Sequence, residues 1–255
     1  MQLIDTHTHL YLPEFDDDRD SVVENAVSSG IEKMLMPNID IRSLAPMYAA
    51  EDRYPGICYS MIGLHPTSVK EDYRQQMEEI VKAMDNHRFI AIGEIGIDLY
   101  WDKTFIKEQE EVFRLQLDLA VSKSLPVAIH SREAFEEIYS ILGEYRGKGL
   151  KGVFHAFTGD VYKARKVTDM GFRLGVGGVV TFKNSGLDAV VKELGPEHLV
   201  LETDSPYLAP VPHRGKRNES SYICIINRKL AEIFDCEVEQ VADITTANAK
   251  KLFNI

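Results

Sequence analysis

Short runs of β-branched residues alternate with amphipathic stretches from one end of the chain to the other. Eight runs have the length and composition of strands: Leu3–His9, Lys33–Pro37, Ile57–Gly63, Phe89–Gly93, Val127–His130, Val153–His155, Phe172–Val176 and Leu199–Glu202. Strands that alternate strictly with helices pair in parallel through right-handed crossovers. Eight such units in 255 residues predict an α/β fold, a (β/α)₈ TIM barrel, as one domain over residues 1–255.

The segments between these runs support helices and loops in the expected places. The stretch Glu108–Lys123 has apolar residues on roughly one helical face, namely Val112, Leu115, Leu119 and Val121. Gly30 and Gly171 fall where a helix would end and a strand begin. The segment Asp204–Asn218 predicts a long loop after the eighth strand. A doubly wound sheet is the alternative, but no GxGxxG loop follows the first strand.

Composition limits the class of protein. Hydrophobic residues make up 44% of the chain and charged residues 27%, which is ordinary for a globular protein with one large core. No apolar run approaches the roughly 20 residues of a membrane helix. No basic flank followed by an apolar stretch marks a signal peptide. We therefore expect a cytoplasmic protein without a membrane partner, and a monomer.

The net charge of −11 argues against a protein that coats long DNA, because phosphate backbones favour basic surfaces. It is compatible with an enzyme whose positive charge is concentrated in one metal-containing cleft. For such an enzyme, the sequence must contain residues that could form a metal-containing cleft.

Metal-ligating residue types gather at the expected ends of the strands, where barrel active sites lie. The first strand run ends in Asp5-Thr-His7-Thr-His9. Side chains alternate along a strand, so His7 and His9 point the same way and can reach one metal ion. Taken alone, such a pair could equally be ordinary polar residues at a strand end.

Four further strand ends add Glu94, His130, His155 and Asp204. Any one of them could be a satisfied polar strand end. Six nitrogen and oxygen ligands on five strand ends exceed the four or so that one tetrahedral ion uses. The surplus favours two metal ions that share a bridging carboxylate.

Six segments resemble signatures of the TatD-type deoxyribonuclease family, in the family's order: Asp5–Leu10, Gly93–Asp98, His130–Glu133, His155–Thr158, Glu202–Pro210 and Pro212–Lys216. They span nearly the whole chain. This family consists of metal-dependent hydrolases on amidohydrolase-type barrels. The resemblance implies a divalent-metal-dependent deoxyribonuclease with DNA as its substrate.

The resemblance also implies which residues bind the ions. One metal would be held by His7, His9, Glu94 and Asp204. The second would be held by Glu94, His130 and His155, with Glu94 as the bridge. Such mixed ligands accept Mg, Mn, Zn, Ni or Fe, so the native metal stays open.

The chemistry expected from this site is hydrolysis of a phosphodiester. Glu94 and Asp204 carry −2 and two divalent ions +4, which leaves the centre near +2 and attractive to phosphate. We expect a water activated by the two metals to attack phosphorus. Asp204 would orient this water and take its proton.

Several neighbours are candidates to hold the substrate. His65, which closes the third strand, could reach a phosphate or the leaving group, and Arg132 is placed for a phosphate oxygen. The basic loop that contains His213, Arg214 and Lys216, with Arg217, suits flanking DNA backbone. A solvated charge run is the alternative reading of this loop.

Other residues are expected to support the ligands. Asp5, Asp98 and Glu202 would orient metal-bound histidines. Tyr100 and Trp101 could stack on a nucleobase, pack in the core or form a lid.

Two alternative functions remain open from the sequence. The first is a hydrolase of the same superfamily acting on a small ester, amide or lactone, or on the acyl bond of aminoacyl-tRNA, since fold alone does not choose the substrate. The basic loop favours nucleic acid. The second is a non-catalytic barrel that binds a partner, which would be expected to lose ligands that are all present here. Exonuclease and endonuclease action are both compatible with the sequence.

Overall fold

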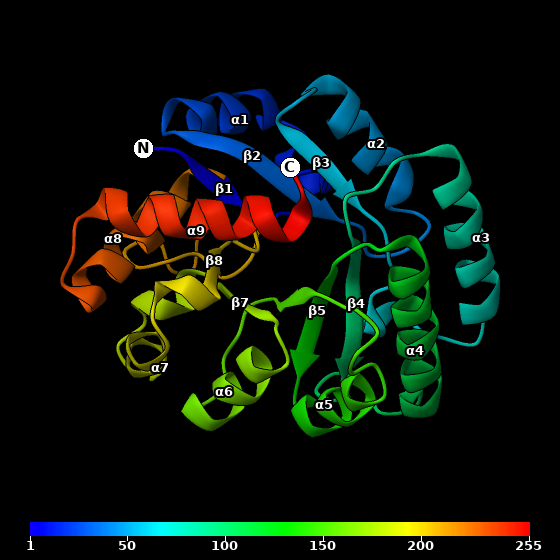
Figure 1. Cartoon of the computed structure of the whole chain (residues 1–255). Helices are drawn as coiled ribbons and strands as arrows, with labels where there is room; N and C mark the ends of the chain where they lie inside the picture. Colours follow the sequence, from blue (N-terminus) through cyan, green and yellow to red (C-terminus); the bar gives the residue numbers. More distant parts are fainter.

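The computed structural model describes residues 1–255 and contains eight parallel strands in two groups (Figure 1). The first group has the order β1 (Leu3–Asp5), β2 (Ile31–Pro37) and β3 (Cys58–Met61). The second has the order β4 (Ile92–Asp98), β5 (Val127–Arg132), β6 (Gly152–Phe154), β7 (Arg173–Val176) and β8 (Leu199–Leu201).

Both seams between the two groups are joined by backbone contacts. Ile62 and Ile92 form a parallel bridge between the β3 and β4 segments. Thr8 and Ser205 form the equivalent bridge beyond β1 and β8, and Thr6 N–H donates to the Leu201 carbonyl at 3.0 Å. The strands therefore surround one interior, and the predicted TIM barrel is confirmed.

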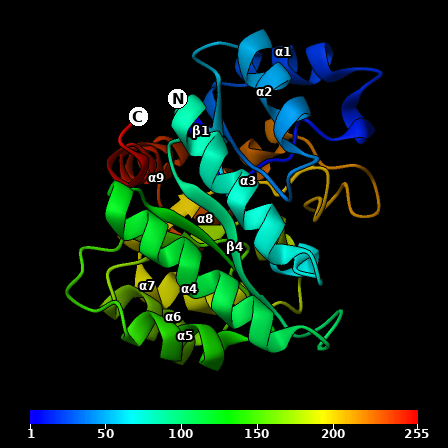
Figure 2. The same cartoon turned by 90° about the vertical axis from the view of Figure 1, so that its right-hand side faces the viewer.

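Helices form the outer layer: α1 (Arg19–Ser28), α2 (Leu44–Arg53), α3 (Tyr73–Asn86), α4 (Ile106–Lys123), α5 (Phe135–Gly143), α6 (Val161–Asp169), α7 (Leu187–Leu194) and α8 (Ile223–Phe234). Short 3₁₀ helices occupy Pro13–Phe15, Pro66–Ser68, Gly178–Thr181, Pro196–His198 and Ser220–Tyr222. Figure 2 shows α3 and α4 side by side along β4. No helix is both long enough and apolar enough to cross a membrane.

The helix α4 buries a different face from the one predicted. Leu115 is 42% exposed, whereas Val112 and Phe113 are buried together with Gln109 and Gln116. The two glutamines face inward because they bind backbone: Gln116 Oε1 accepts the Leu64 N–H at 2.6 Å. Because glutamine is polar, a pattern of apolar residues does not identify these two positions as buried.

The strand β4 also differs from its prediction, which ended at Gly93. It runs on to Asp98, since Gly96 pairs with His130 and Asp98 with Arg132 of β5. Gly96 permits this pairing, because a Cβ there would lie within 2.0 Å of the His130 carbonyl oxygen. Glu94 consequently projects from a strand rather than from a loop.

A ninth helix that the sequence pattern did not reveal, α9 (Val238–Phe253), closes the N-terminal end of the barrel (Figure 1). Its Ala249 and Phe253 pack on one interior layer of strand residues: Ile4, Leu35, Met61, Ala91, Ala128, Val153 and Val200. This end is therefore sealed by apolar side chains, and the polar strand ends lie at the other.

The connections agree with the sequence in two respects. Gly30 and Gly171 follow helices with φ of +93° and +84°, a conformation that glycine adopts without the steric cost other residues incur. The segment between β8 and the 3₁₀ helix at Ser220 contains no other helix or strand, as expected for the long loop.

Candidate metal centre

The six residues expected to bind metal converge at the C-terminal ends of the strands. They are His7 and His9 just beyond β1, Glu94 in β4, His130 in β5, His155 just beyond β6, and Asp204 beyond β8. All except His130 and Asp204 are buried. The barrel brings together side chains that are up to 197 positions apart in the sequence, and Glu94 lies at their centre.

The two carboxylate oxygens of Glu94 face different histidines. Oε2 lies 3.2 Å from Nε2 of His7 and 3.7 Å from Nε2 of His9. Oε1 lies 2.9 Å from Nδ1 of His130 and 3.7 Å from Nε2 of His155. A carboxylate with one oxygen directed at each set of imidazoles has the arrangement that a bridging ligand requires.

Asp204 faces the same group from the opposite side of the barrel mouth. Its Oδ1 lies 3.5 Å from Nε2 of His9 and 3.8 Å from Nε2 of both His7 and His155. The Asp204 backbone is left-handed, with φ of +56°, and its N–H donates to the His7 carbonyl at 2.9 Å. Aspartate tolerates this conformation better than most residues, so the loop fixes the carboxylate over the histidines.

His65 lies closer to the cluster than a residue that only binds substrate needs to be. Its Nε2 is 3.4 Å from Oε1 of Glu94. Donor atoms of His65, Glu94 and His130 all lie within 4.8 Å of one another, as do those of His7, His9 and Glu94. His155 instead forms such a group with His7 and Asp204. The second set expected from the sequence therefore has His65 where His155 was placed.

Two carboxylates behind the cluster orient two of the histidines. Oδ2 of Asp98 lies 2.9 Å from Nε2 of His130. Oε1 of Glu202 lies 3.0 Å from Nδ1 of His155 and accepts the Ala156 N–H at 2.5 Å. In each ring the other nitrogen faces Glu94, at 2.9 Å from Nδ1 of His130 and 3.7 Å from Nε2 of His155. The hydrogen bond to Asp98 fixes the ring plane of His130, and Glu202 places a negative charge beside His155.

The expectation for Asp5 was wrong. Its carboxylate contacts no imidazole ring: it accepts the Thr203 hydroxyl at 2.6 Å, the Thr203 N–H at 2.9 Å and the His7 N–H at 3.3 Å. Asp5 therefore ties the β1 end to the β8 end through backbone. Burial, partly offset by these bonds, raises the pKa of Asp5 to about 7.

Tyr11 is a supporting residue that the sequence did not reveal. Its hydroxyl lies 3.1 Å from Nδ1 of His9 and donates to the Pro37 carbonyl at 2.6 Å. A tyrosine near a strand end is usually a core residue, so no signal distinguished it. The only hint is its position two residues after His9.

Electrostatics in the cluster favour ionised carboxylates. Burial alone would raise the pKa of Glu94, but His65, His155 and His7 outweigh it and hold that pKa well below the usual range. Burial would lower the pKa of His155, yet Glu202, Glu94 and Asp204 raise it to about 10. The ionised carboxylates therefore favour positive charge beside them, either as protons on the imidazoles or as bound cations.

The donor set fits divalent metal ions. Five imidazoles and two carboxylates present nitrogen and oxygen atoms that lie within 4.8 Å of one another in three groups. These are the ligand types of Zn, Mn, Ni and related ions, and carboxylates also suit Mg. Buried charges of this kind are retained in proteins mainly where they are paired or bind metal.

A cavity of about 640 Å³ opens above the cluster and includes Arg132 in its lining. The guanidinium of Arg132 lies 3.8 Å from the ring centre of Tyr100 and 5.1 Å from that of Trp101. Tyr100 is 49% and Trp101 67% exposed, so neither is a core residue. Tyr207, 48% exposed, stands on another side of the same mouth.

The basic loop lies outside the lining of this cavity. His213 stacks on Tyr222 at 4.2 Å between ring centres, and the guanidinium of Arg214 lies 4.2 Å over the ring of Phe182. Lys216 is exposed. Arg217 forms an ion pair with Asp18 at 2.7 Å, so it is already engaged within the protein.

Comparison with known proteins assigns this arrangement to a family. The family model described as "TatD related DNase" matches residues 4–254. The chain belongs to the TatD related DNase family.

Proteins similar to this chain match it over its whole length. The metal-dependent hydrolase YabD of Bacillus subtilis is 39% identical, with 99% of each chain covered. The metal-dependent hydrolase YcfH of Escherichia coli is 30% identical, covering 100% of this chain and 97% of its own. The crystal structure of the Escherichia coli TatD homologue YjjV superposes with a TM-score of 0.93 at 28% identity, covering 99% and 98% of the two chains. The chain is therefore a TatD-family metal-dependent hydrolase.

Proposed function

We propose that this TatD-family hydrolase is a divalent-metal-dependent deoxyribonuclease that cleaves DNA phosphodiester bonds at a two-metal centre. The observation that carries the proposal is Glu94, whose two oxygens face two separate groups of imidazoles. One ion would use His7, His9, Glu94 and Asp204. The other would use Glu94 and His130, with His155 or His65 completing it. The family name supports DNA as the substrate.

Two divalent ions, when bound, would polarise the phosphate, lower the pKa of a water molecule and neutralise the charge that develops at phosphorus. Asp204 orients the attacking water and accepts its proton. Burial alone would raise the pKa of this carboxyl, but His155 and the other histidines hold it below the usual value. Asp204 is therefore ionised at neutral pH and can accept a proton.

Two side chains at the cavity hold the phosphodiester. Arg132 makes no ion pair within the protein, and its stacking on Tyr100 leaves guanidinium N–H groups for phosphate oxygens. His65 has its Nδ1 engaged by Thr67 at 2.6 Å, so its Nε2 edge faces the cavity. His65 serves the leaving oxygen or the phosphate unless it is itself a metal ligand.

The open mouth of the cavity favours a polymer over a small ester. Trp101, Tyr207 and Leu208 border it and are 67%, 48% and 41% exposed, so the cavity is open to solvent at these residues. His213, Arg214 and Lys216 would contact DNA beyond the scissile bond. Removal of both Arg214 and Lys216 should reduce the salt dependence of DNA binding by about one to two in the log–log slope, and an unchanged slope would exclude them. A cytoplasmic location and a monomeric state remain predictions.

Digestion of end-labelled single- and double-stranded DNA tests the function. The protein is stripped of metal with a chelator, reloaded with Mg²⁺, Mn²⁺, Zn²⁺ or Ni²⁺, and compared with Asp204→Asn, whose backbone contact to His7 is retained. We expect cleavage by the reloaded wild type only and a loss of roughly 10²-fold or more in the variant. Product lengths separate exonuclease from endonuclease action. Inertness of the reloaded wild type toward DNA, with hydrolysis of aryl esters or lactones, would replace the proposal by the small-ester alternative.

A further inference from the structure

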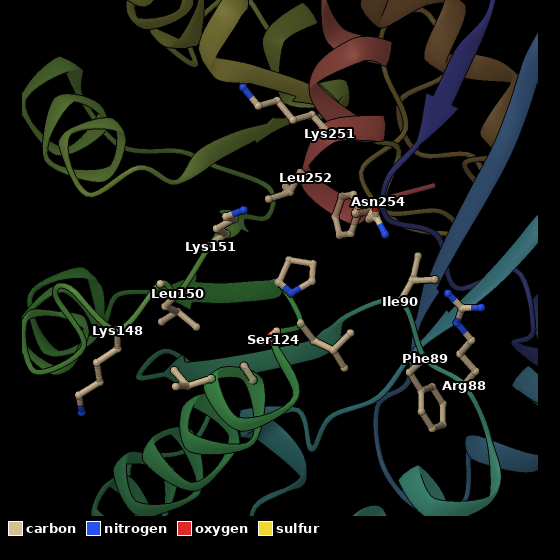
Figure 3. A pocket seen from close by; sticks show the side chains of 16 residues that line it. Arg88, Phe89, Ile90, Ser124, Lys148, Leu150, Lys151, Lys251, Leu252 and Asn254 are labelled. Carbon is tan, nitrogen blue, oxygen red and sulfur yellow. The ribbon is translucent and has the colours of Figure 1, made fainter.

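A second cavity, of about 610 Å³, lies at the opposite end of the barrel (Figure 3). Its walls come from the segments that precede three consecutive strands, namely Arg88–Ile90 before β4, Ser124–Pro126 before β5 and Lys148–Lys151 before β6. The fourth wall is the C-terminal end of α9, Lys251–Asn254. The sealed apolar layer under α9 separates this cavity from the metal centre.

Basic residues line this cavity, and no acidic residue does. Its sixteen lining residues include Arg88, Lys148, Lys151 and Lys251 but no aspartate or glutamate. The chain as a whole has 40 acidic and 29 basic residues, so an acid-free cavity with four cations runs against its composition. None of the four forms an ion pair, whereas the adjacent Lys250 pairs with Glu32 at 2.8 Å.

Helix ends explain only one of these cations. Lys251 lies in the last turn of α9, where a positive charge stabilises the helix dipole. Arg88, Lys148 and Lys151 lie in loops that lead into strands, so the dipole does not account for them. Separated in sequence by up to 63 positions, they are brought to one cavity by the barrel.

The cavity also offers apolar surface beside the charges. Phe89 and Pro126 are buried, and Leu150 and Leu252 are partly buried along its lining. In Figure 3 Leu150 lies between Lys148 and Lys151, and Leu252 lies beside Lys251. Ligand sites commonly combine such apolar walls with a few charged groups in volumes of about 300–1,000 Å³.

We propose that this cavity binds a phosphate monoester with a flat organic body, the size of a mononucleotide. Arg88 and Lys151, which lie on opposite sides of the cavity in Figure 3, supply the positive charge that attracts the phosphate, because guanidinium and ammonium groups without carboxylate partners are free to bind its oxygens. The apolar walls contact the organic body. Because the site lies across the barrel from the metal centre, its ligand does not compete with substrate for that centre. The proposal does not depend on the identity of the bond that the enzyme cleaves.

Titration calorimetry on the metal-loaded protein tests this site with three probes: 2′-deoxyadenosine 5′-monophosphate, inorganic phosphate and deoxyadenosine. We expect the nucleotide to bind most tightly, because only it engages both the cations and the apolar walls. Arg88→Glu and Lys151→Glu should each weaken it roughly tenfold or more, as for the loss of a charge-assisted hydrogen bond. The matched control is Lys192→Glu, an exposed lysine of α7 without an ion pair, which should bind as the wild type does.

Asp204→Asn distinguishes the two ends of the barrel, since it should leave this binding unchanged. Loss of nucleotide binding in Asp204→Asn, with wild-type binding in Lys151→Glu, would place the ligand at the metal centre and overturn the proposal. Weaker binding of a single-stranded oligonucleotide by Lys151→Glu, without any effect on the mononucleotide, would also overturn it in favour of a nucleic-acid surface. Failure of DNA digestion affects neither outcome.

Discussion

The substitution Asp98→Asn should change which nitrogen of His130 carries the proton. Two backbone N–H groups, of Tyr100 and Trp101, donate to Oδ1 of Asp98 at 2.9 and 3.0 Å. They will hold the asparagine oxygen in that place, so the amide nitrogen must take the place of Oδ2. There it faces Nε2 of His130, which is 2.9 Å from Oδ2 in the wild type.

An asparagine amide donates where the carboxylate accepted, so Nε2 of His130 must become an acceptor. The remaining ring proton then lies on Nδ1, the nitrogen 2.9 Å from Oε1 of Glu94. A protonated nitrogen cannot ligate a metal. Loss of a carboxylate that supports a metal-binding histidine typically costs 10–100-fold in affinity, so we expect about 1.4–2.7 kcal/mol weaker binding of one ion.

Competition with a chromophoric chelator measures this affinity for Mn²⁺ or Zn²⁺, and urea denaturation of the metal-free protein serves as the check on the fold. The matched control is Asp102→Asn on the same loop, which only disrupts an exposed ion pair with Lys70, worth about 0–1 kcal/mol. Wild-type metal affinity in Asp98→Asn, with the fold intact, would refute the assignment of His130 as a ligand oriented by Asp98.

Two further predictions concern Glu202 and the histidine it contacts. In Gly175→Ala the new Cβ would lie 2.2 Å from Oε2 of Glu202, so we expect a loss of about 1–3 kcal/mol in the free energy of unfolding together with weaker metal binding. The control is Gly143→Ala, whose new Cβ would meet nothing within 4 Å. Equal stability of the two variants would contradict the packing around Glu202. Because the pKa of His155 is raised from 6.5 to about 10, the metal-free protein holds a proton there at pH 7, and its contribution to stability is complete below pH 6.5 and is lost as the pH rises toward 10. Metal binding should therefore release protons and strengthen with pH; calorimetry in buffers of different ionisation enthalpy measures this release, and an enthalpy that is independent of buffer would count against it.

Residues whose position follows from strand order could be predicted from the sequence. His7, Glu94, His130, His155 and Asp204 each lie within a strand or beyond its C-terminal end, and parallel strands in a barrel bring such positions to one rim. The strand pattern of the sequence was sufficient to predict that these residues lie close together. The structure adds how Glu94 divides its oxygens between two groups, which no sequence pattern encodes.

Roles that depend on the direction of a side chain could not be predicted from the sequence. Asp5 is two positions from His7, as an orienting carboxylate could be, yet it bonds to Thr203 because β1 and β8 adjoin. Tyr11 supports His9 from a turn, where strand periodicity gives no direction. The helix α9 was not predicted because threonine and alanine, as in Thr245 and Ala249, interrupt the apolar stripe between the larger Val241 and Phe253 on its buried face.

The most direct test of the central claim is the number and coupling of ions bound around Glu94. The stripped protein is loaded with Mn²⁺, its bound metal is counted after equilibrium dialysis, and its electron paramagnetic resonance spectrum is recorded beside that of Glu94→Gln. We predict two ions per chain with the spectrum of an exchange-coupled pair in the wild type, and loss of the coupling in the variant. One ion per chain, or two ions without coupling, would contradict a centre bridged by Glu94.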